Sequence, residues 1–184
     1  MNKYLGVIAA IAAALAVAPH AHAAGEFYAG VDLMRMKDKG DHAPAFYPLG
    51  LGIRGGMQVH PNVAVEARYT AGVKSDNNTV SGMNVELELN QIYGVYAKGM
   101  LPLGRVSPYL LVGYTHGKET AKISAIGMSS AGSDGDFSYG IGIDVPITKD
   151  ITFGAEWARF IKGTDPFGVG FKIEGMTFNV SMRF

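Results

Sequence analysis

Apolar side chains recur with a period of two in eight separate segments of this chain, and this period constrains the fold more than any other sequence feature. In one segment, 107–120, the continuous apolar run 109–112 leaves the facing of the side chains open. In a β-strand successive side chains point to opposite faces, so the period predicts strands and excludes amphipathic helices. The predicted strands are residues 26–36, 49–59, 63–70, 83–98, 107–120, 136–145, 151–160 and 176–184. The sequence therefore predicts an all-β protein.

The spacing of these segments narrows the fold class further. Most are close to the roughly 9 to 11 residues that a tilted strand needs to cross the hydrocarbon layer of a bilayer. Their connections alternate between short turns and mostly longer polar loops: 60–62, 100–106 and 146–150 against 37–48, 71–82, 121–135 and 161–169. Short turns at one end and long loops at the other are typical of an eight-stranded antiparallel up-and-down transmembrane β-barrel. An even number of strands places both termini at the short-turn end, which is predicted to be periplasmic.

The two faces of the predicted strands differ in chemistry. One face is apolar and carries aromatic residues near the segment ends, whereas the other collects charges and glycines. Alternation alone also fits a soluble β-sandwich with the apolar face inside. The aromatic positions and the glycine-rich polar face favour the inverted arrangement, with lipid outside and a narrow polar lumen inside.

The first residues have the composition of an export signal. Lys3 precedes an apolar stretch over residues 4–18, Pro19 interrupts it, and Ala21-His22-Ala23 forms a small-residue cleavage box. The stretch is shorter than the roughly 20 residues of a spanning helix. We expect a cleavable signal peptide over residues 1–23 and one barrel domain over residues 24–184.

In pattern, residues 24–184 resemble the small outer-membrane β-barrel family, which includes the OmpA transmembrane domain and OmpX-like proteins. The resemblance implies location in the outer membrane, with outer-membrane lipids and lipopolysaccharide as neighbours. It also implies that the barrel-assembly machinery recognises the final strand through Met176, Phe178, Val180, Met182 and Phe184. Met182 departs from the family, in which tyrosine is common. No peptidoglycan-binding domain of the OmpA type is expected, because nothing follows the last strand.

The lumen of an eight-stranded barrel is narrow enough for side chains to fill it, so inward charges need partners. The polar faces of the predicted strands supply both signs. We expect structural interior pairs from Arg54, Glu66, Arg68, Glu86, Glu88, Lys98, Asp144, Glu156 and Arg183. An ion or proton path through the same residues is the alternative.

The functional expectation is a non-enzymatic barrel with a structural or surface-interaction role carried by its extracellular loops, whose ligand the sequence does not name. A net formal charge of zero gives no field that would recruit nucleic acid. No catalytic, cofactor-binding or metal-binding residues are predicted.

The alternatives to this surface-interaction role are a narrow pore for small solutes and a lipid A-modifying enzyme. His116, near Thr115, Glu119 and Thr120, is the histidine best placed for such an enzyme, but no nucleophile motif surrounds it.

Overall fold

The computed structural model describes residues 26–40, 44–80, 83–123, 128–164 and 170–184. Nine strands lie in these ranges. They are β1 (Glu26–Gly40), β2 (Leu49–His60), β3 (Val63–Lys74), β4 (Asp76–Val80), β5 (Met83–Met100), β6 (Ser107–Ile123), β7 (Met128–Pro146), β8 (Ile151–Thr164) and β9 (Gly170–Arg183). Within the same ranges, no helix is long and apolar enough to span a membrane. The predicted signal peptide, residues 1–23, lies outside the described residues and stays a prediction.

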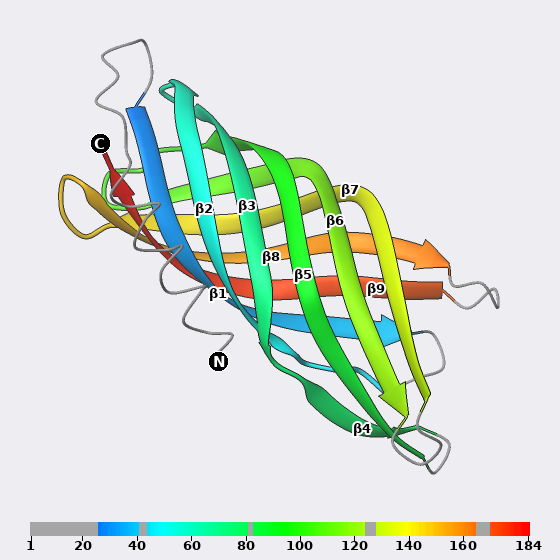
Figure 1. Cartoon of the computed structure of the whole chain (residues 1–184). Helices are drawn as coiled ribbons and strands as arrows, with labels where there is room; N and C mark the ends of the chain where they lie inside the picture. Colours follow the sequence, from blue (N-terminus) through cyan, green and yellow to red (C-terminus); the bar gives the residue numbers. More distant parts are fainter. Residues whose placement is uncertain (1–25, 41–43, 81–82, 124–127, 165–169) are drawn as a thin grey trace.

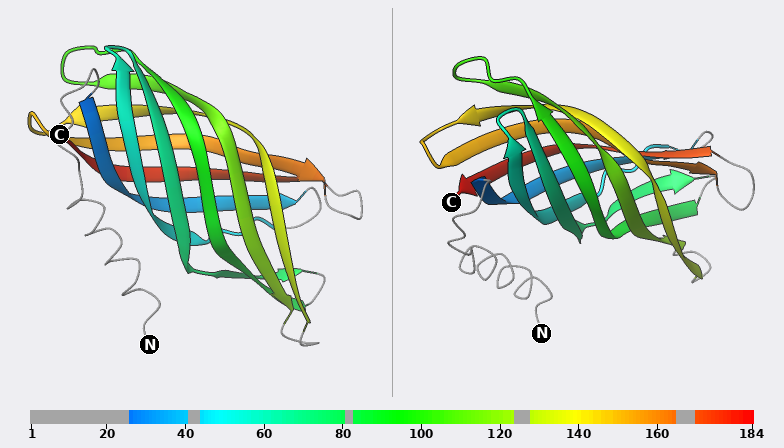
Figure 2. Two further views of the ribbon diagram at one scale, coloured as in Figure 1. Left: turned by 45° about the horizontal axis from the view of Figure 1, so that its top comes forward. Right: turned by 90° about the horizontal axis from the view of Figure 1, so that it is seen from above.

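The strands close into a single antiparallel barrel (Figure 1). Except for β3 and β4, strands that follow one another in the chain pair with each other; β1 pairs with β9, and β3 pairs with β5 to complete the ring. The short β4 follows β3 after one residue, Ser75, and continues along the edge of β5. The wall therefore has eight positions, as predicted, and one of them is shared by β3 and β4. Figure 2 shows the strands tilted against the barrel axis, as closure of a sheet requires.

The two ends of the barrel are different. Both chain ends of the barrel and three short turns lie at one end, where the amide of Phe184 donates to the carbonyl of Phe27 over 2.9 Å. We call this the terminal end, and the opposite end the hairpin end. At the hairpin end the strands run further than the sequence suggested: β6 continues to Ile123, β7 begins at Met128, and β8 continues to Thr164. Much of the predicted loop regions 121–135 and 161–169 is strand, because cross-strand pairing continues beyond the segments with clean alternation.

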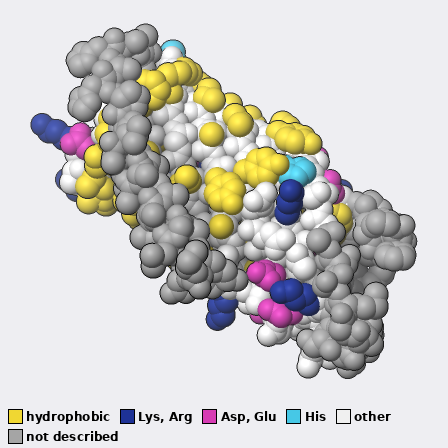
Figure 3. Space-filling model, viewed as in Figure 1, with side chains coloured by type: hydrophobic (Ala, Val, Ile, Leu, Met, Phe, Trp, Pro, Cys, Tyr) yellow, Lys and Arg dark blue, Asp and Glu magenta, His cyan; other side chains and the backbone are white. Residues whose placement is uncertain are grey.

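The apolar side chains face outward. Residues such as Val95, Leu110, Ile141 and Phe178 are 45–65% exposed, whereas polar residues such as Glu66 and Thr115 are fully buried. On the face seen in Figure 3, hydrophobic side chains spread over the wall and the charged side chains lie toward the two ends of the barrel. The wall is therefore built for contact with lipid, and the polar face of each strand lines the lumen.

Candidate functional site

A layer of buried charges crosses the lumen. We call it the charge layer, and it consists of Asp32, Arg54, Glu66, Arg68 and Glu156 from β1, β2, β3 and β8. Arg54 Nε donates to Asp32 Oδ1 over 2.6 Å, and the two Nη atoms of Arg68 donate to the two carboxylate oxygens of Glu156 over 2.6 and 2.8 Å. Arg68 Nε also contacts Glu66. Arg54 on β2 contacts carboxylates on β1 and β3, and Arg68 on β3 contacts Glu156 on β8. The layer therefore links opposite sides of the wall through charged hydrogen bonds.

Tyrosines complete this layer. The Tyr28 hydroxyl donates to Glu66 and the Tyr109 hydroxyl donates to Glu156, each over 2.8 Å. The Arg68 guanidinium lies 4.9 Å from the centre of the Tyr96 ring, within the range of a cation–π contact. The Tyr28 phenol donates to the Glu66 oxygen that Arg68 Nε does not contact, and the Tyr109 phenol adds a second donor to Glu156 Oε2. These extra hydrogen bonds reduce the cost of burying the charges.

A second ion pair lies beside the charge layer. Lys98 Nζ donates to Asp144 Oδ2 over 2.6 Å and lies 4.0 Å from the centre of the Tyr109 ring. Six of the nine residues expected to form interior pairs therefore come together here. They are Arg54, Glu66, Arg68, Lys98, Asp144 and Glu156.

The other three do not join them. Arg183, at the end of β9, pairs with Glu26 over 3.2 Å at the terminal rim, where both side chains are about half exposed. Glu86 and Glu88 lie on the outer side of β5, because Asn90 forms a β-bulge between Leu89 and Gln91. One extra residue reverses the facing of everything beyond it, so Leu87 and Leu89 point inward and the two glutamates point outward.

The interior tyrosines were not among the predicted site residues. A usable signal existed in the glycines opposite them: Tyr28 pairs with Gly56, and Tyr109 pairs with Gly142. A Cβ atom at either glycine would overlap the ring of its tyrosine partner. Glycine at these positions makes room for a large inward side chain.

An apolar layer closes the lumen between the charge layer and the hairpin end. We call it the apolar plug, and each of its members is at most 3% exposed. It consists of Met34, Met36, Leu89, Ile92, Ala158, Phe160, Ile161 and Ile173. Two bulges supply half of it, since Asn90 separates Leu89 from Ile92 and the irregularity between Arg159 and Ile161 turns both Phe160 and Ile161 inward.

Two carboxyl groups, Asp38 and Glu119, lie at the outer edge of this plug, where Asp38 is directly opposite Ile173 and Glu119 is directly opposite Leu89. Their neighbours along the strands, Lys37, Lys39 and Lys118, are polar, which places the pair outside the membrane-spanning part of the wall. Burial raises the pKa of Asp38, and burial together with the negative charge of Asp38 raises the pKa of Glu119. The two groups therefore hold protons more tightly than free carboxyls do.

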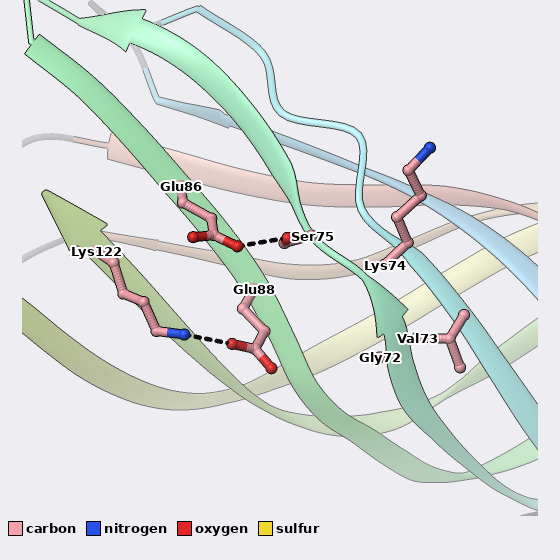
Figure 4. Close-up of a pocket in the computed structure, with 7 residues that line it drawn as sticks. All are labelled: Gly72, Val73, Lys74, Ser75, Glu86, Glu88 and Lys122. Atoms are coloured by element: carbon pink, nitrogen blue, oxygen red, sulfur yellow. Dashed lines mark hydrogen bonds and ion pairs between the residues drawn. The ribbon is translucent and has the colours of Figure 1, made fainter. Parts of the chain in front are cut away.

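A cleft of about 370 Å³ opens in the wall where β3 ends and β4 begins (Figure 4). Ser75 Oγ donates to Glu86 over 2.6 Å, and Lys122 Nζ donates to Glu88 over 2.7 Å. Lys74 and Gly72 complete the rim. One ion pair and one hydrogen bond thus join side chains of neighbouring strands across this cleft, which has the chemistry of a polar seam between strands.

Within the described part of the chain, His116 makes no hydrogen bond to a serine or carboxylate side chain of the kind that a catalytic histidine needs. Its ring lies against that of Tyr93, with 5.2 Å between the ring centres, on the outer side of the barrel. Thr115 points the other way and contacts the hydroxyls of Tyr96 and Ser138 in the lumen. Among the described residues, no group of three or more His, Cys, Asp or Glu side chains could hold a metal ion.

A closed antiparallel barrel with an apolar outer wall and a filled polar lumen defines a transmembrane β-barrel of the outer membrane. The model of the outer membrane protein beta-barrel domain family matches residues 7–184, and the chain belongs to this family. It is embedded in the lipids of the outer membrane through its apolar wall.

Solved structures with the same fold come from several bacteria. Ail, the attachment invasion locus protein of Yersinia pestis, is 18% identical with a TM-score of 0.62, over 88% of this chain and 100% of Ail. Neisserial surface protein A is 15% identical with a TM-score of 0.66, over 86% of this chain and 97% of its own. The N-terminal barrel of OprF from Pseudomonas aeruginosa is 14% identical with a TM-score of 0.56, over 87% and 99%. No curated protein matches the sequence.

The predicted assembly residues lie on the outer face of β9. Met176, Phe178, Val180, Met182 and Phe184 are all 40–46% exposed. A linear row of apolar side chains on the last strand is available to another protein before the barrel closes. Recognition by the barrel-assembly machinery stays a prediction.

Proposed function

We propose that this chain is a non-enzymatic surface barrel that acts through contacts made by its hairpin end, outside the cell. The observation that carries the proposal is that two successive layers fill the lumen, while the strands that project furthest carry polar side chains beyond the membrane at the hairpin end. An activity that depends on access to the interior has no free path through this barrel.

The projecting part is largest on one side. β5, β6 and β7 contain 18, 17 and 19 residues, well beyond the roughly 9 to 11 needed to cross the hydrocarbon. From Tyr93 to its start at Met83, β5 extends roughly 30 Å along the strand, at about 3.3 Å per residue. Together with β4 these strands form a sheet that stands out from the barrel (Figure 1).

The outer face of this projecting sheet is polar and mixed in charge. Asn90 Nδ2 donates to Thr120 over 2.9 Å, and Lys122 pairs with Glu88 over 2.7 Å. Such a face stays soluble outside the membrane and offers hydrogen-bonding groups on a rigid support. Two structural neighbours are by name an attachment protein and a surface protein, and one structure of Ail holds the heparin analogue sucrose octasulfate. These names support a role in attachment for this chain.

The test is to shorten the projecting sheet while keeping the barrel. Replacing residues 79–84 by Asn-Gly joins the paired residues Asn78 and Val85, and replacing 121–130 by Asn-Gly joins the paired Thr120 and Ala131. We expect bacteria that display the full chain to attach to cultured mammalian cells and to immobilised heparin several-fold more than bacteria that display the shortened barrel.

A matched control replaces residues 165–169 by a Gly-Ser segment of equal length, which leaves β4 to β7 intact. Equal attachment by the shortened and the full barrel, both folded by heat-modifiable migration, would refute the proposal. A change in lipid A mass that depends on His116 would replace it by the enzymatic alternative.

A further inference from the structure

The projecting sheet of β4 to β7 separates from the strands on both sides of it at the hairpin end. On one side, the main-chain pairing between β7 and β8 ends at Tyr139 and Arg159. Beyond this point the Asp136 carboxylate accepts the amide of Lys162 over 3.0 Å. On the other side, the pairing of β3 with β5 ends at Gln91, and β3 continues along β2. Within the described residues, bending of the sheet at these points therefore breaks no main-chain ladder.

Asp38 and Glu119 face each other across the lumen at this level. They belong to opposite positions of the wall, because β2, β3 and β5 separate β1 from β6 in one direction and β9, β8 and β7 separate them in the other. Glu119 is directly opposite Leu89 and Asp38 is directly opposite Ile173. Both of these apolar side chains are buried in the plug, so the two carboxyl groups also point inward. The pair thus connects the projecting sheet with β1.

Each of the two carboxyl groups has an oxygen that is shielded from solvent and has no hydrogen-bond partner among the described residues. These atoms are Asp38 Oδ1 and Glu119 Oε1. A buried acceptor without a donor is costly, and one proton shared by the pair removes the cost for both atoms. Asp38 is also fixed in place, since its amide and its carbonyl both bond to the main chain of Phe46 over 3.0 and 2.9 Å.

The side chains around the pair supply no positive charge within the described part of the chain. The lysines of the same strands alternate with the inward residues and therefore point outward; they are Lys37, Lys39, Lys118, Lys162 and Lys172. The other inward carboxylates at this end are Asp76 on β4 and Asp134 and Asp136 on β7. Each of them accepts a main-chain amide. The inward residues of β5, β8 and β9 are apolar here.

These surroundings determine when the pair carries a proton. Burial raises the pKa of Asp38 to about 6, and burial together with the charge of Asp38 raises the pKa of Glu119 to about 8. Carboxyl groups exposed by opening have a pKa of about 4. The closed form therefore holds one more proton than the open form between about pH 6 and 8. Because the closed form holds more protons, a rise in pH through this range favours opening.

From this arrangement we propose that Asp38 and Glu119 form a proton-dependent latch, which holds the projecting sheet toward β1 and releases it when Glu119 gives its proton to water. In the closed form the Glu119 hydroxyl donates to Asp38. In the open form two ionised carboxylates repel each other, and the sheet bends away where its main-chain pairing ends. The latch adds regulation by pH to the proposed attachment surface. Only this consequence rests on the proposed function, because the movement belongs to the barrel itself.

The test measures the distance between β1 and β6 by double electron–electron resonance on the full chain in lipid vesicles. The chain has no cysteine, so Lys39→Cys/Lys118→Cys places one spin label on each strand, at exposed positions next to the pair. We expect one distance at pH 6 and a second, longer distance at higher pH. The ratio of the second to the first is expected to rise about tenfold per pH unit until about pH 8 and then to level off, because opening releases one proton.

In the labelled protein, Glu119→Gln is expected to keep the single distance from pH 6 to 9, because its amide donates to Asp38 and does not titrate. The matched control, Glu88→Gln, neutralises an outward carboxylate of the same sheet and is expected to respond as the parent does. Heat-modifiable migration checks that every variant is folded. A parent distance that does not change with pH, or a change that persists in Glu119→Gln, would overturn the proposal.

The latch and the attachment role fail separately. A distance that changes with pH in a barrel that does not attach to cells or to heparin refutes the proposed function and leaves the latch in place. Attachment by a barrel whose distance is constant has the opposite meaning. If both proposals hold, attachment by the parent differs between pH 6 and 9, and attachment by Glu119→Gln does not.

Discussion

At the scale of single residues, Arg68 is the centre of the charge layer. Its guanidinium contacts Glu66, holds Glu156 through two hydrogen bonds and lies over the Tyr96 ring. Removing one member of a buried ionic network leaves the partner charge without compensation, which costs about 3–5 kcal/mol. We expect Arg68→Leu to lower the free energy of unfolding by that amount. Urea unfolding in lipid vesicles, followed by the fluorescence of the single tryptophan, Trp157, measures it.

Two further variants separate charge from packing. In the Arg68→Leu background, Glu156→Gln is expected to restore part of the lost stability, because a neutral amide costs less to bury than an unpaired carboxylate. Lys122→Gln breaks the half-exposed pair with Glu88 and is expected to cost less than about 1 kcal/mol. A loss below about 1 kcal/mol in Arg68→Leu would show that the charge layer does not stabilise the barrel.

At the scale of elements, the bulge at Asn90 decides which side of β5 faces the lumen. The chain has no cysteine, so single substitutions give clean accessibility probes. Leu87 is 7% exposed, whereas the neighbouring Glu88 side chain is 33% exposed. We expect Glu88→Cys to react with a water-soluble maleimide much faster than Leu87→Cys in the folded protein. The reverse order would mean that unbroken alternation, without the bulge, describes β5.

The same bulge shows what the sequence can and cannot predict. Alternation located the eight wall positions, and it placed Arg54, Glu66, Arg68 and Glu156 on one face because no bulge precedes them within their strands. A two-residue period in the sequence does not reveal where a bulge inserts an extra residue. The predicted inward facing of Glu86 and Glu88 was therefore wrong. The run 109–112 is apolar throughout, and its facing follows from the cross-strand register rather than from the sequence.

At the scale of the whole molecule, two successive layers of side chains block the lumen of the barrel. The charge layer fills the lumen with paired side chains, and the apolar plug blocks the space between that layer and the hairpin end. An ion would have to displace the pairs and then cross an apolar region without hydration, and each barrier alone suffices to stop it. We therefore expect no ohmic openings from the parent protein in planar bilayers.

Because the barriers lie in series, opening one of them leaves the lumen closed. Met36→Ala/Phe160→Ala thins the apolar plug, and Tyr96→Ala/Tyr109→Ala opens space around the charge layer. We expect each double variant to be silent in single-channel recordings and the combined variant to conduct, with heat-modifiable migration confirming that all three are folded. Reproducible openings from the parent, or from a plug variant whose charge layer is intact, would show that the lumen carries solutes. The narrow pore would then replace the surface-interaction role.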